Sequence, residues 1–582
     1  MDIALDAPPV LEQFNRAGVL NLADVHVAKT LARVCGEEDA SVLLAAALAV
    51  RAPRLGHVCL EMATVAESVA PDEDAEIAPE SLEWPDVGAW VAALEGSSLV
   101  GDDAPLRLEQ GLLYLNRSWR AEQAVIRSLL DRVSGATPAV HEPALSTALA
   151  GIKNEQQRAA VEAAARGRLS VIAGGPGTGK TYTIKTVLSV LLGQATALGQ
   201  EPPQVAVVAP TGKAAQRATE AIGDDDLKAT TIHKLLRRDP GNATRFRHNA
   251  RNPLPHDVVI VDETSMVSLD LMAKLLSAVK PEARLILVGD PDQLVSVESG
   301  AVLGDIVGPM RTRNAGGPFA GTIVVLEHVY RHGGGIAQLA RSIQGGKPDE
   351  VLGVLDGGHE DVTWLQADVG AAEGLAAALA PVRAVVVDAG RRLLAAARAG
   401  DAESATTALQ CLDEVRVLCA HRRGAYGVEQ WVAQVEKWMA LDVEGFDPLH
   451  PWYVGRPILV TQNDYQLGVL NGDTGVTIAG ENGDPQVAFR LADGIRLIRP
   501  QRLENVQTVH AMTIHKSQGS QFDTVVALLP DPTSKILTRE LFYTAVTRAK
   551  QRLIVAATPA SITAAVQRQV VRSSGLRDAL WG

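Results

Sequence analysis

The chain has 582 residues, 47% of them hydrophobic, and a formal net charge of −13. No stretch approaches the roughly 20 uncharged apolar residues that span a bilayer, and the chain opens with Asp2 and Asp6 instead of a basic region, so we expect no membrane helix, no secretory signal and a cytoplasmic protein. The four cysteines lack the two-residue spacing of zinc or iron–sulfur ligands, which favours buried, reduced thiols.

Residues 1–145 are rich in Ala and Leu at helical spacing, as in Leu43–Leu48, and predict a mainly helical N-terminal domain. Residues 1–150 contain 23 acidic and 10 basic residues, so they carry the whole net charge and the rest of the chain is neutral. This charge suits a protein-contact region better than a DNA clamp, and an acidic face that is simply solvated explains it equally well.

From residue 146 the pattern changes to short β-branched runs that alternate with helical stretches, which indicates a parallel α/β lobe. We assign residues 146–345 to this first lobe, with a small insertion at about 237–256. Its strands are expected at 169–173, 205–209, 258–261, 285–288 and 323–326.

Residues 346–582 are assigned to a second α/β lobe, whose first part, 346–410, shows only Ala-rich helices and no clear motif. Strands are expected at 415–420, 458–461, 524–529 and 553–556. Between about 463 and 509 the chain is rich in Gly, Asp and Asn, with a turn at Asn471-Gly472-Asp473, which predicts a small β insertion.

A complete P-loop pattern follows the first predicted strand of the first lobe and precedes a helical stretch, which is the context that this motif requires. Backbone amides of such a loop approach phosphate oxygens at the N-terminus of a helix. Lys180 would reach the β- and γ-phosphates and Thr181 would ligate Mg²⁺. The motif comprises Gly174, Gly175, Pro176, Gly177, Thr178, Gly179, Lys180 and Thr181.

Acidic and amide side chains follow two later strands of the same lobe. Asp262 and Glu263 end the run 258–261, where Asp262 would hold Mg²⁺ and Glu263 would deprotonate the attacking water. Gln293 follows the strand at 285–288 and could sense the γ-phosphate through that water. Taken alone, the Asp-Glu pair also suits a solvated strand end and the segment around Gln293 an ordinary turn. Together with the P-loop they define a P-loop NTPase.

The ordered set of segments resembles superfamily 1 DNA helicases, in detail the RecD family. The resemblance implies that Gln157 reads adenine, that Tyr330 stacks on it, and that Arg331 and Arg548 reach the γ-phosphate. It also implies DNA contacts from Pro210, Thr211, Lys213, His233, Thr513, His515 and Lys516. The matching segments are Asn154 to Gln157, the P-loop, Ala209 to Ala215, Thr230 to Leu236, Val261 to Met266, Gly289 to Gly300, Tyr330-Arg331, Thr513 to Gly519 and Tyr543 to Ala549.

The N-terminal segments Leu43–Leu48, Gly56 to Leu60 and Tyr114 to Trp119 also resemble the RecD family, whose N-terminal domain docks onto a RecC subunit. One position departs from the family pattern: Gln521 stands where an acidic residue usually follows Gly519-Ser520. Glutamine keeps the shape and the hydrogen bonding but loses the charge, so any charge-dependent role of this position is in doubt.

The expected fold is α/β: two RecA-like P-loop NTPase lobes, a mainly helical N-terminal domain and a small SH3-like β insertion in the second lobe. The resemblance implies an ATP- and Mg²⁺-dependent 5′→3′ DNA helicase, partnered by RecB-like and RecC-like subunits in a helicase–nuclease that processes double-strand break ends. We find no nuclease constellation in the sequence, so a partner would supply the cutting. Two alternatives stay open: a free-standing RecD-like helicase, and a regulatory subunit that binds ATP without unwinding.

Overall fold

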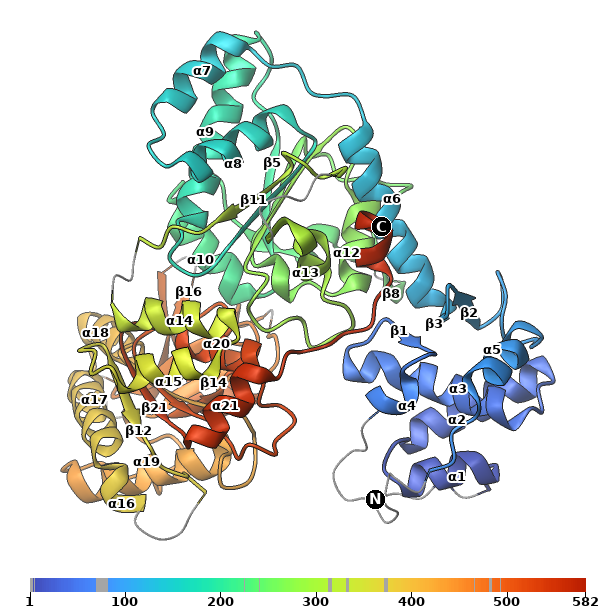
Figure 1. Ribbon diagram of the computed structural model, residues 1–582. Helices are drawn as coiled ribbons and strands as arrows, with labels where there is room; N and C mark the ends of the chain where they lie inside the picture. Colours follow the sequence, from blue (N-terminus) through green and yellow to red (C-terminus); the bar gives the residue numbers. More distant parts are fainter. Residues whose placement is uncertain are drawn as a thin grey trace.

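The computed structural model describes residues 4, 6–69, 82–224, 226–239, 241–311, 317–330, 334–370, 375–464, 466–480, 484–491 and 494–582. Figure 1 shows three parts: the first lobe at the top, the second lobe at the lower left and the N-terminal part at the lower right. No helix in these ranges is long and apolar enough to cross a bilayer.

A six-stranded parallel sheet in the order β11-β4-β10-β9-β5-β6 forms the centre of the first lobe. The central strands are buried along their whole length, as strands covered by helices on both faces must be. The five strands predicted for this lobe are all present. The strands are β4 (Leu169–Gly174), β5 (Val205–Ala209), β6 (Thr230–Thr231), β9 (Val258–Val261), β10 (Arg284–Gly289) and β11 (Ile323–Leu326).

Alternate residues of β4 point to opposite faces of this sheet: Val171 joins one apolar core and Ile172 the other. The core around Ile172 includes α7 (Glu142–Ala150), α8 (Glu155–Arg166), α9 (Lys180–Ala197) and α10 (Gly212–Ile222). The core around Val171 includes α11 (Ile232–Leu236), α12 (Leu269–Ala278) and α13 (Val302–Val307). Within the predicted insertion, β7 (Arg238–Asp239) and β8 (Asn242–Phe246) form an antiparallel hairpin.

A five-stranded parallel sheet in the order β12-β21-β20-β13-β19 forms the second lobe. Its core includes Ile336, Leu339 and Ile343 of α14, so this helix packs on the second lobe although the sequence assigned residues up to 345 to the first. The strands are β12 (Val362–Leu365), β13 (Val415–Cys419), β19 (Ala511–Thr513), β20 (Phe522–Leu528) and β21 (Ala549–Ala556). The helices are α14 (Gly335–Gly345), α15 (Pro348–Asp356), α16 (Leu375–Ala378), α17 (Ala380–Ala399), α18 (Ala402–Leu412), α19 (Val428–Asp442), α20 (Arg539–Val546) and α21 (Pro559–Gln567).

The predicted β insertion is an antiparallel sheet in the order β17-β16-β15-β14-β18. It begins with β14, slightly before the predicted start at residue 463. Its likeness to an SH3 fold stays a prediction. The strands are β14 (Pro457–Val460), β15 (Thr474–Ile478), β16 (Gln486–Leu491), β17 (Gly494–Ile498) and β18 (Val506–Thr508).

The N-terminal part has its own core, in which Phe14, Leu44 and Trp90 are fully buried. Helix α3 is buried on nearly all sides because its apolar residues are continuous, and Asp39 caps its N-terminus. The helices are α1 (Pro9–Arg16), α2 (Leu22–Cys35), α3 (Ala40–Arg51), α4 (Val65–Ser68) and α5 (Val87–Glu95), and a small sheet is formed by β1 (Cys59–Glu61), β2 (Leu106–Glu109) and β3 (Leu112–Leu115).

Helix α6 (Asn116–Ser134) connects this part to the first lobe. Its residues Val125, Ile126 and Leu129 belong to the first-lobe core, on the side of α12. The buried Arg132 donates hydrogen bonds to the carbonyls of Val279 and Ala283, just beyond the end of α12. The end of the chain, α22 (Leu576–Trp581), packs against α6 and α13, so the C-terminus lies beside α6 in Figure 1.

Candidate nucleotide site

The P-loop turns sharply between β4 and α9. Gly177 and Gly179 have φ angles of 81° and 87°, in the left-handed region that glycine adopts most readily. A Cβ at Gly179 would also lie only 2.5 Å from Nε2 of Gln157 and 3.5 Å from Cε2 of Tyr330. The turn therefore requires glycine twice, and it brings Gln157 and Tyr330, both predicted adenine contacts, to the same point.

Lys180 is the first residue of α9, and its ammonium group folds back onto the loop. It donates to the carbonyls of Gly174 and Gly175 at 2.7 and 2.9 Å. The hydroxyl of Thr178 donates to the same Gly175 carbonyl at 2.8 Å. These bonds hold the loop closed around the lysine, and a phosphate oxygen would compete with the two carbonyls for its charge.

Two carboxylates follow β9 at the carboxyl edge of the sheet. Glu263 has a φ of 51°, which turns its side chain away from the strand direction, and its backbone N–H donates to Asp262. Burial and the adjacent Glu263 raise the pKa of Asp262 to about 6, against the opposing charge of Lys180. The Asp262 carboxylate and the Thr181 hydroxyl are the hard oxygen ligands that Mg²⁺ prefers, so the donor set fits that ion.

The segment 289–300, here called the sensor loop, begins at the last residue of β10 and contacts the second lobe. Asp290 is fully buried and accepts hydrogen bonds from the Gln293 side chain at 3.0 Å and from the Tyr543 hydroxyl of α20 at 3.1 Å. Burial raises the pKa of Asp290 to about 6. Leu294 donates its N–H to the Thr544 hydroxyl and accepts from the Gln518 side chain.

Arg548 reaches the site from the second lobe, directly after α20. Its guanidinium is 2% exposed and donates to the carbonyls of Thr544 and Ser520 at 3.1 and 3.2 Å. Burial lowers its pKa, while the negative charge of Glu263 in the first lobe acts in the opposite direction. An arginine held in place by backbone carbonyls needs little reorganisation to stabilise charge that develops on a phosphate.

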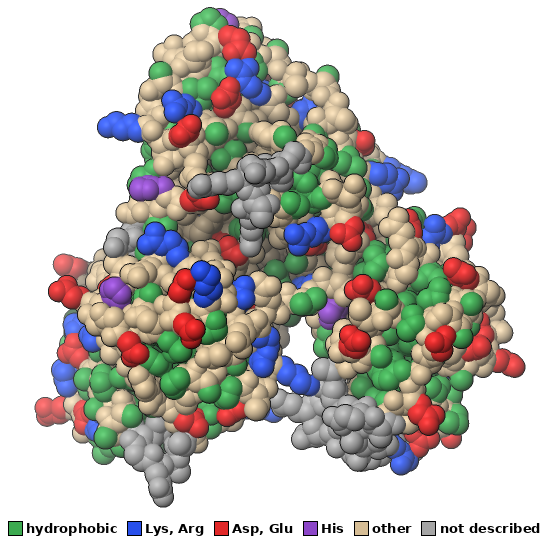
Figure 2. Space-filling model, in the orientation of Figure 1, with side chains coloured by type: hydrophobic (Ala, Val, Ile, Leu, Met, Phe, Trp, Pro, Cys, Tyr) green, Lys and Arg blue, Asp and Glu red, His purple; other side chains and the backbone are tan. Residues whose placement is uncertain are grey.

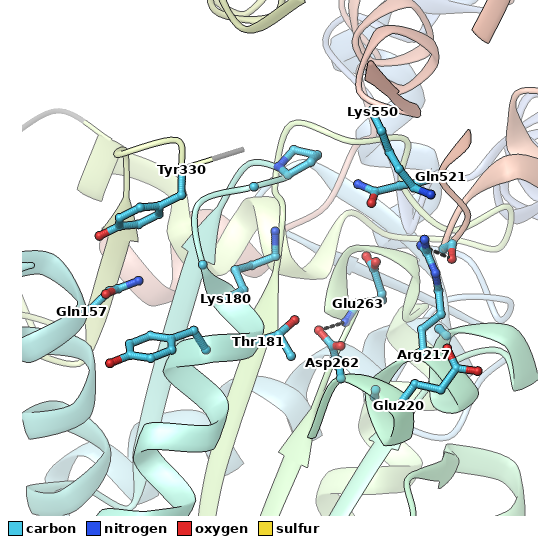
Figure 3. Close-up of a pocket in the computed structure, with 18 of the residues that line it drawn as sticks. Gln157, Lys180, Thr181, Arg217, Glu220, Asp262, Glu263, Tyr330, Gln521 and Lys550 are labelled. Carbon is cyan, nitrogen blue, oxygen red and sulfur yellow. Dashed lines mark hydrogen bonds between the residues drawn. The ribbon is translucent and has the colours of Figure 1, made fainter. Parts of the chain in front are cut away.

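These side chains surround one cavity of about 1180 Å³ between the lobes. Figure 3 shows Lys180, Thr181, Asp262 and Glu263 on its first-lobe wall, with Gln521 and Lys550 facing them from the second lobe. Of the predicted nucleotide-site residues, the cavity is lined by Gln157, Pro176, Gly177, Gly179, Lys180, Thr181, Asp262, Glu263, Gln293, Tyr330 and Arg548. Gly174, Gly175 and Thr178 support it from within the loop, and Arg331 lies outside the described residues.

Sequence reasoning missed a further basic residue of this site, Arg217 on α10. It lines the cavity and donates to the Gly519 carbonyl of the second lobe at 2.6 Å, a bond that Figure 3 shows beside Glu263 and above Glu220. No local pattern marked it, because its partner Gly519 lies 302 residues further along the chain.

Three of the predicted DNA contacts occupy matching places in the two lobes. Pro210 and Thr211 follow β5, and Thr513 ends β19, so all three lie at carboxyl ends of parallel strands. Each threonine hydroxyl accepts a backbone N–H three residues on, from Ala214 and Lys516 respectively. The two threonines thus stabilise the turns that carry the neighbouring predicted DNA contacts.

The two predicted histidine contacts lie one in each lobe. His233 lies edge-on to Phe246 of the hairpin, with ring centroids 5.7 Å apart, and burial lowers its pKa. His515 and Lys516 are half-buried, and burial together with the positive charge of Arg422 lowers the pKa of both. Arg422 was not predicted from the sequence.

Lys213 stands apart from the other predicted DNA contacts. It lines a small cavity between the lobes together with Asp413 and Asp473, and burial lowers its pKa to about 8. Beside it, a Cβ at Gly212 would lie 2.5 Å from Leu470. In this arrangement of the lobes, Lys213 therefore faces carboxylates of the second lobe.

Two RecA-like lobes, with a P-loop and paired carboxylates in one and a buried arginine from the other, define a P-loop ATPase of the superfamily 1 helicase type. Three family models match the chain: the RecBCD enzyme subunit RecD N-terminal domain over residues 16–114, an AAA domain over 157–299 and a UvrD-like helicase C-terminal domain over 508–556.

Similar proteins cover nearly the whole chain. RecBCD enzyme subunit RecD of Mycolicibacterium smegmatis is 47% identical over 98% of this chain and 99% of its own length. The protein of the same name from Mycobacterium tuberculosis is 44% identical over 99% of this chain and 98% of its own length. ATP-dependent RecD2 DNA helicase of Deinococcus radiodurans is 31% identical over 82% of this chain but only 60% of its own length. The chain belongs to the RecD family of superfamily 1 DNA helicases.

Proposed function

We propose that the chain is the ATP-driven 5′→3′ DNA helicase subunit of a RecBCD-type helicase–nuclease, which processes double-strand break ends for recombinational repair. The observation that carries this proposal is the cavity between the lobes, whose walls come from both of them. A nucleotide there touches both lobes, so its hydrolysis changes the contacts that hold them together.

In the proposed site, Gln157 and Tyr330 hold the adenine, with Tyr330 half exposed and so able to stack on it. Lys180 leaves the carbonyls of Gly174 and Gly175 for the β- and γ-phosphates. Thr181 and Asp262 hold Mg²⁺, which neutralises phosphate charge when bound.

Glu263 takes a proton from the attacking water, which Gln293 orients, and Arg548 stabilises charge on the transferred phosphoryl group. Arg331 is proposed as a second arginine at the γ-phosphate on the resemblance alone. Movement of the lobes then carries a DNA strand across Thr211, His233, Thr513, His515 and Lys516, with Lys213 reaching it once the lobes separate.

The proposed partners are RecB-like and RecC-like subunits. In support, two relatives named as RecBCD subunits match over nearly their whole length, and the N-terminal part matches a model of that subunit's own domain. The acidic N-terminal region suits protein contact. The free-standing alternative is less well supported, because the RecD2 relative is matched over only 60% of its length.

The test is ATP hydrolysis and unwinding by the purified chain on duplexes with a 5′ or a 3′ single-stranded tail. DNA-stimulated hydrolysis with unwinding from the 5′ tail alone is expected. Co-purification with the RecB-like and RecC-like proteins of the same organism tests the assembly. Hydrolysis with no unwinding, even with these partners present, would favour the regulatory alternative, and unwinding from the 3′ tail would overturn the polarity.

A further inference from the structure

The C-terminal segment 568–575, here called the strap, crosses from the second lobe to the first. Figure 1 shows it as the red trace that leaves α21 and ends at α22 beside α6. On the second lobe, the Arg568 guanidinium donates to the carbonyls of Pro532 and Leu537, and the Val570 N–H donates to Glu540 on α20 at 3.0 Å. These bonds fix the start of the strap to the helix that precedes Arg548.

The far end of the strap is fixed to the sensor loop. Arg572 donates to the carbonyls of Glu298 and Gly300 at 2.6 and 3.2 Å. Only Val571, which is 75% exposed, separates this anchor from Val570. Because two residues of extended chain span about 7 Å at most, the two anchors cannot move far apart unless one of them breaks.

The sensor loop is therefore held by the second lobe from two sides. On the nucleotide side, Asp290 and Leu294 bond to Tyr543 and Thr544 of α20. On the other side, the strap ties Glu298 and Gly300 back to Glu540 of the same helix. A rotation of α20 must move both ends of the loop, or break one of these contacts.

The same anchor reaches the N-terminal part. The Ser573 N–H donates to Nδ1 of His57, and the Ser573 carbonyl accepts from the Val58 N–H at 2.9 Å. The Gly300 N–H donates to the Gly56 carbonyl at 3.0 Å, and a Cβ on Gly56 would lie 2.6 Å from Cζ of Arg572. Residues 56–58 thus contact both the strap and the sensor loop.

Two predicted DNA contacts lie within electrostatic reach of this junction. The charge of Arg572 acts on His515, and that of Glu298 on His233, each a predicted DNA contact. Figure 2 shows an opening between the second lobe and the N-terminal part, with Lys and Arg side chains on its second-lobe side. The strap lies where nucleotide-dependent movement and a DNA strand would meet.

We propose that Arg572 is a positioning residue and that the strap is a short mechanical link between the lobes. It makes the sensor loop, the residues beside it and the N-terminal part follow α20 when the lobes move. This inference rests on the proposed motor function, since it says how lobe movement is coupled to DNA. Through the same contacts, movement of the two lobes would also reach the N-terminal part.

The sharpest test inserts four glycines between Val571 and Arg572 in the full chain, which preserves every anchor and adds about 14 Å of reach. ATP hydrolysis without DNA and the melting temperature are expected to stay unchanged. Stimulation of ATP hydrolysis by single-stranded DNA is expected to fall by roughly 5-fold or more. This factor is the smallest effect that one coupled site typically has on another. The control is the same insertion after Gly358, in an exposed loop where added residues meet nothing. Equal stimulation in the two insertion variants would overturn the proposal.

Substitutions at the anchor separate coupling from simple stabilisation. Arg572→Ala is expected to lower DNA stimulation as the insertion does, and Arg572→Lys to restore it only in part, because an ammonium group lacks the fork that meets two carbonyls. The exposed Arg391→Ala is the control. If Arg572→Ala lowers the melting temperature alone, with the ratio of stimulated to unstimulated hydrolysis unchanged, then Arg572 has only a structural role.

Amide exchange without DNA distinguishes this proposal from the proposed function. A nonhydrolysable ATP analogue is expected to change exchange at residues 56–58 and 573–575 in the unmodified chain and not in the four-glycine variant. Absence of DNA stimulation in the unmodified chain would overturn the motor function. If the analogue changes exchange in the four-glycine variant as much as in the unmodified chain, the strap proposal is overturned, independently of any DNA stimulation.

Discussion

The hydroxyl of Tyr543 in the second lobe donates to the Asp290 carboxylate in the first lobe at 3.1 Å, and both side chains are buried. The same hydroxyl lies over the P-loop, because a Cβ at Gly175 would meet it at 2.8 Å. One phenol group therefore touches the phosphate-binding loop and the sensor loop, and it does so from the helix that precedes Arg548.

We expect Tyr543→Phe to leave the buried Asp290 with one partner fewer, at a cost of about 1–3 kcal/mol in the free energy of unfolding. ATP affinity should change little, since no predicted nucleotide contact is removed, while DNA-stimulated hydrolysis should fall. Chemical denaturation and steady-state hydrolysis measure the two effects. Tyr453→Phe is a matched control, because its hydroxyl bonds Glu436 and neither residue lines the nucleotide cavity or contacts the strap. Equal losses of DNA stimulation in the two variants would remove Tyr543 from the coupling.

Lys180→Ala is expected to lower the rate of ATP hydrolysis by on the order of 10²–10³-fold or more, because the preorganised positive charge of Lys180 at the phosphates is lost. The fold should persist, because the bonds lost are two contacts with loop carbonyls. Lys185→Ala, on the exposed side of the same helix, should behave as the unmodified chain. Unchanged turnover in Lys180→Ala would overturn the P-loop assignment.

Much of the fold could be predicted because its signals are local. Strand β4 is a short apolar run, and Gly177 and Gly179 stand where only glycine fits the turn. The contacts that join the lobes could not be predicted, because they connect residues far apart in the sequence. Arg217 meets Gly519 and Arg572 meets Glu298 only after both lobes have folded, and no local pattern marks either pair. The docking of α6 on α12 was missed for the same reason.

Arg548→Ala should still bind ATP but hydrolyse it very slowly, because the residue is placed to stabilise developing charge and not the bound ground state. Arg548→Lys should recover little, since one ammonium group cannot keep both carbonyl contacts with Thr544 and Ser520. Equilibrium binding of a fluorescent ATP analogue, measured beside turnover, separates the two steps. A parallel loss of affinity and turnover would place Arg548 in ground-state binding instead.

The raised pKa of Asp262 gives a pH dependence with a definite sign. Its pKa of about 6 lies above the ordinary range of an aspartate, because burial and Glu263 disfavour the charged form. Below about pH 6 the group is protonated and loses its affinity for Mg²⁺, so hydrolysis should fall there. Binding of Mg–ATP favours the ionised form and should release protons near pH 6 but few at pH 8. Calorimetry in buffers of different ionisation enthalpy measures this release, and its persistence in Asp262→Asn would assign it to another group.

Arg217→Ala removes the contact with the Gly519 carbonyl and a positive charge that favours the ionised form of Asp262. We therefore expect weaker Mg–ATP binding and an acid limit of hydrolysis displaced to higher pH, since Asp262 would hold its proton more tightly.

Arg217→Lys should restore the pH profile, because the positive charge remains. It should not restore the full rate, because the bond across the lobes at 2.6 Å depends on the length and fork of arginine. Arg127→Ala, which removes an exposed arginine of α6 that bonds only within its own helix, is the charge-matched control. Pre-steady-state hydrolysis across pH 5–8 decides between the two effects, and identical profiles for Arg217→Ala and Arg127→Ala would show that Arg217 acts on neither the metal site nor the joining of the lobes.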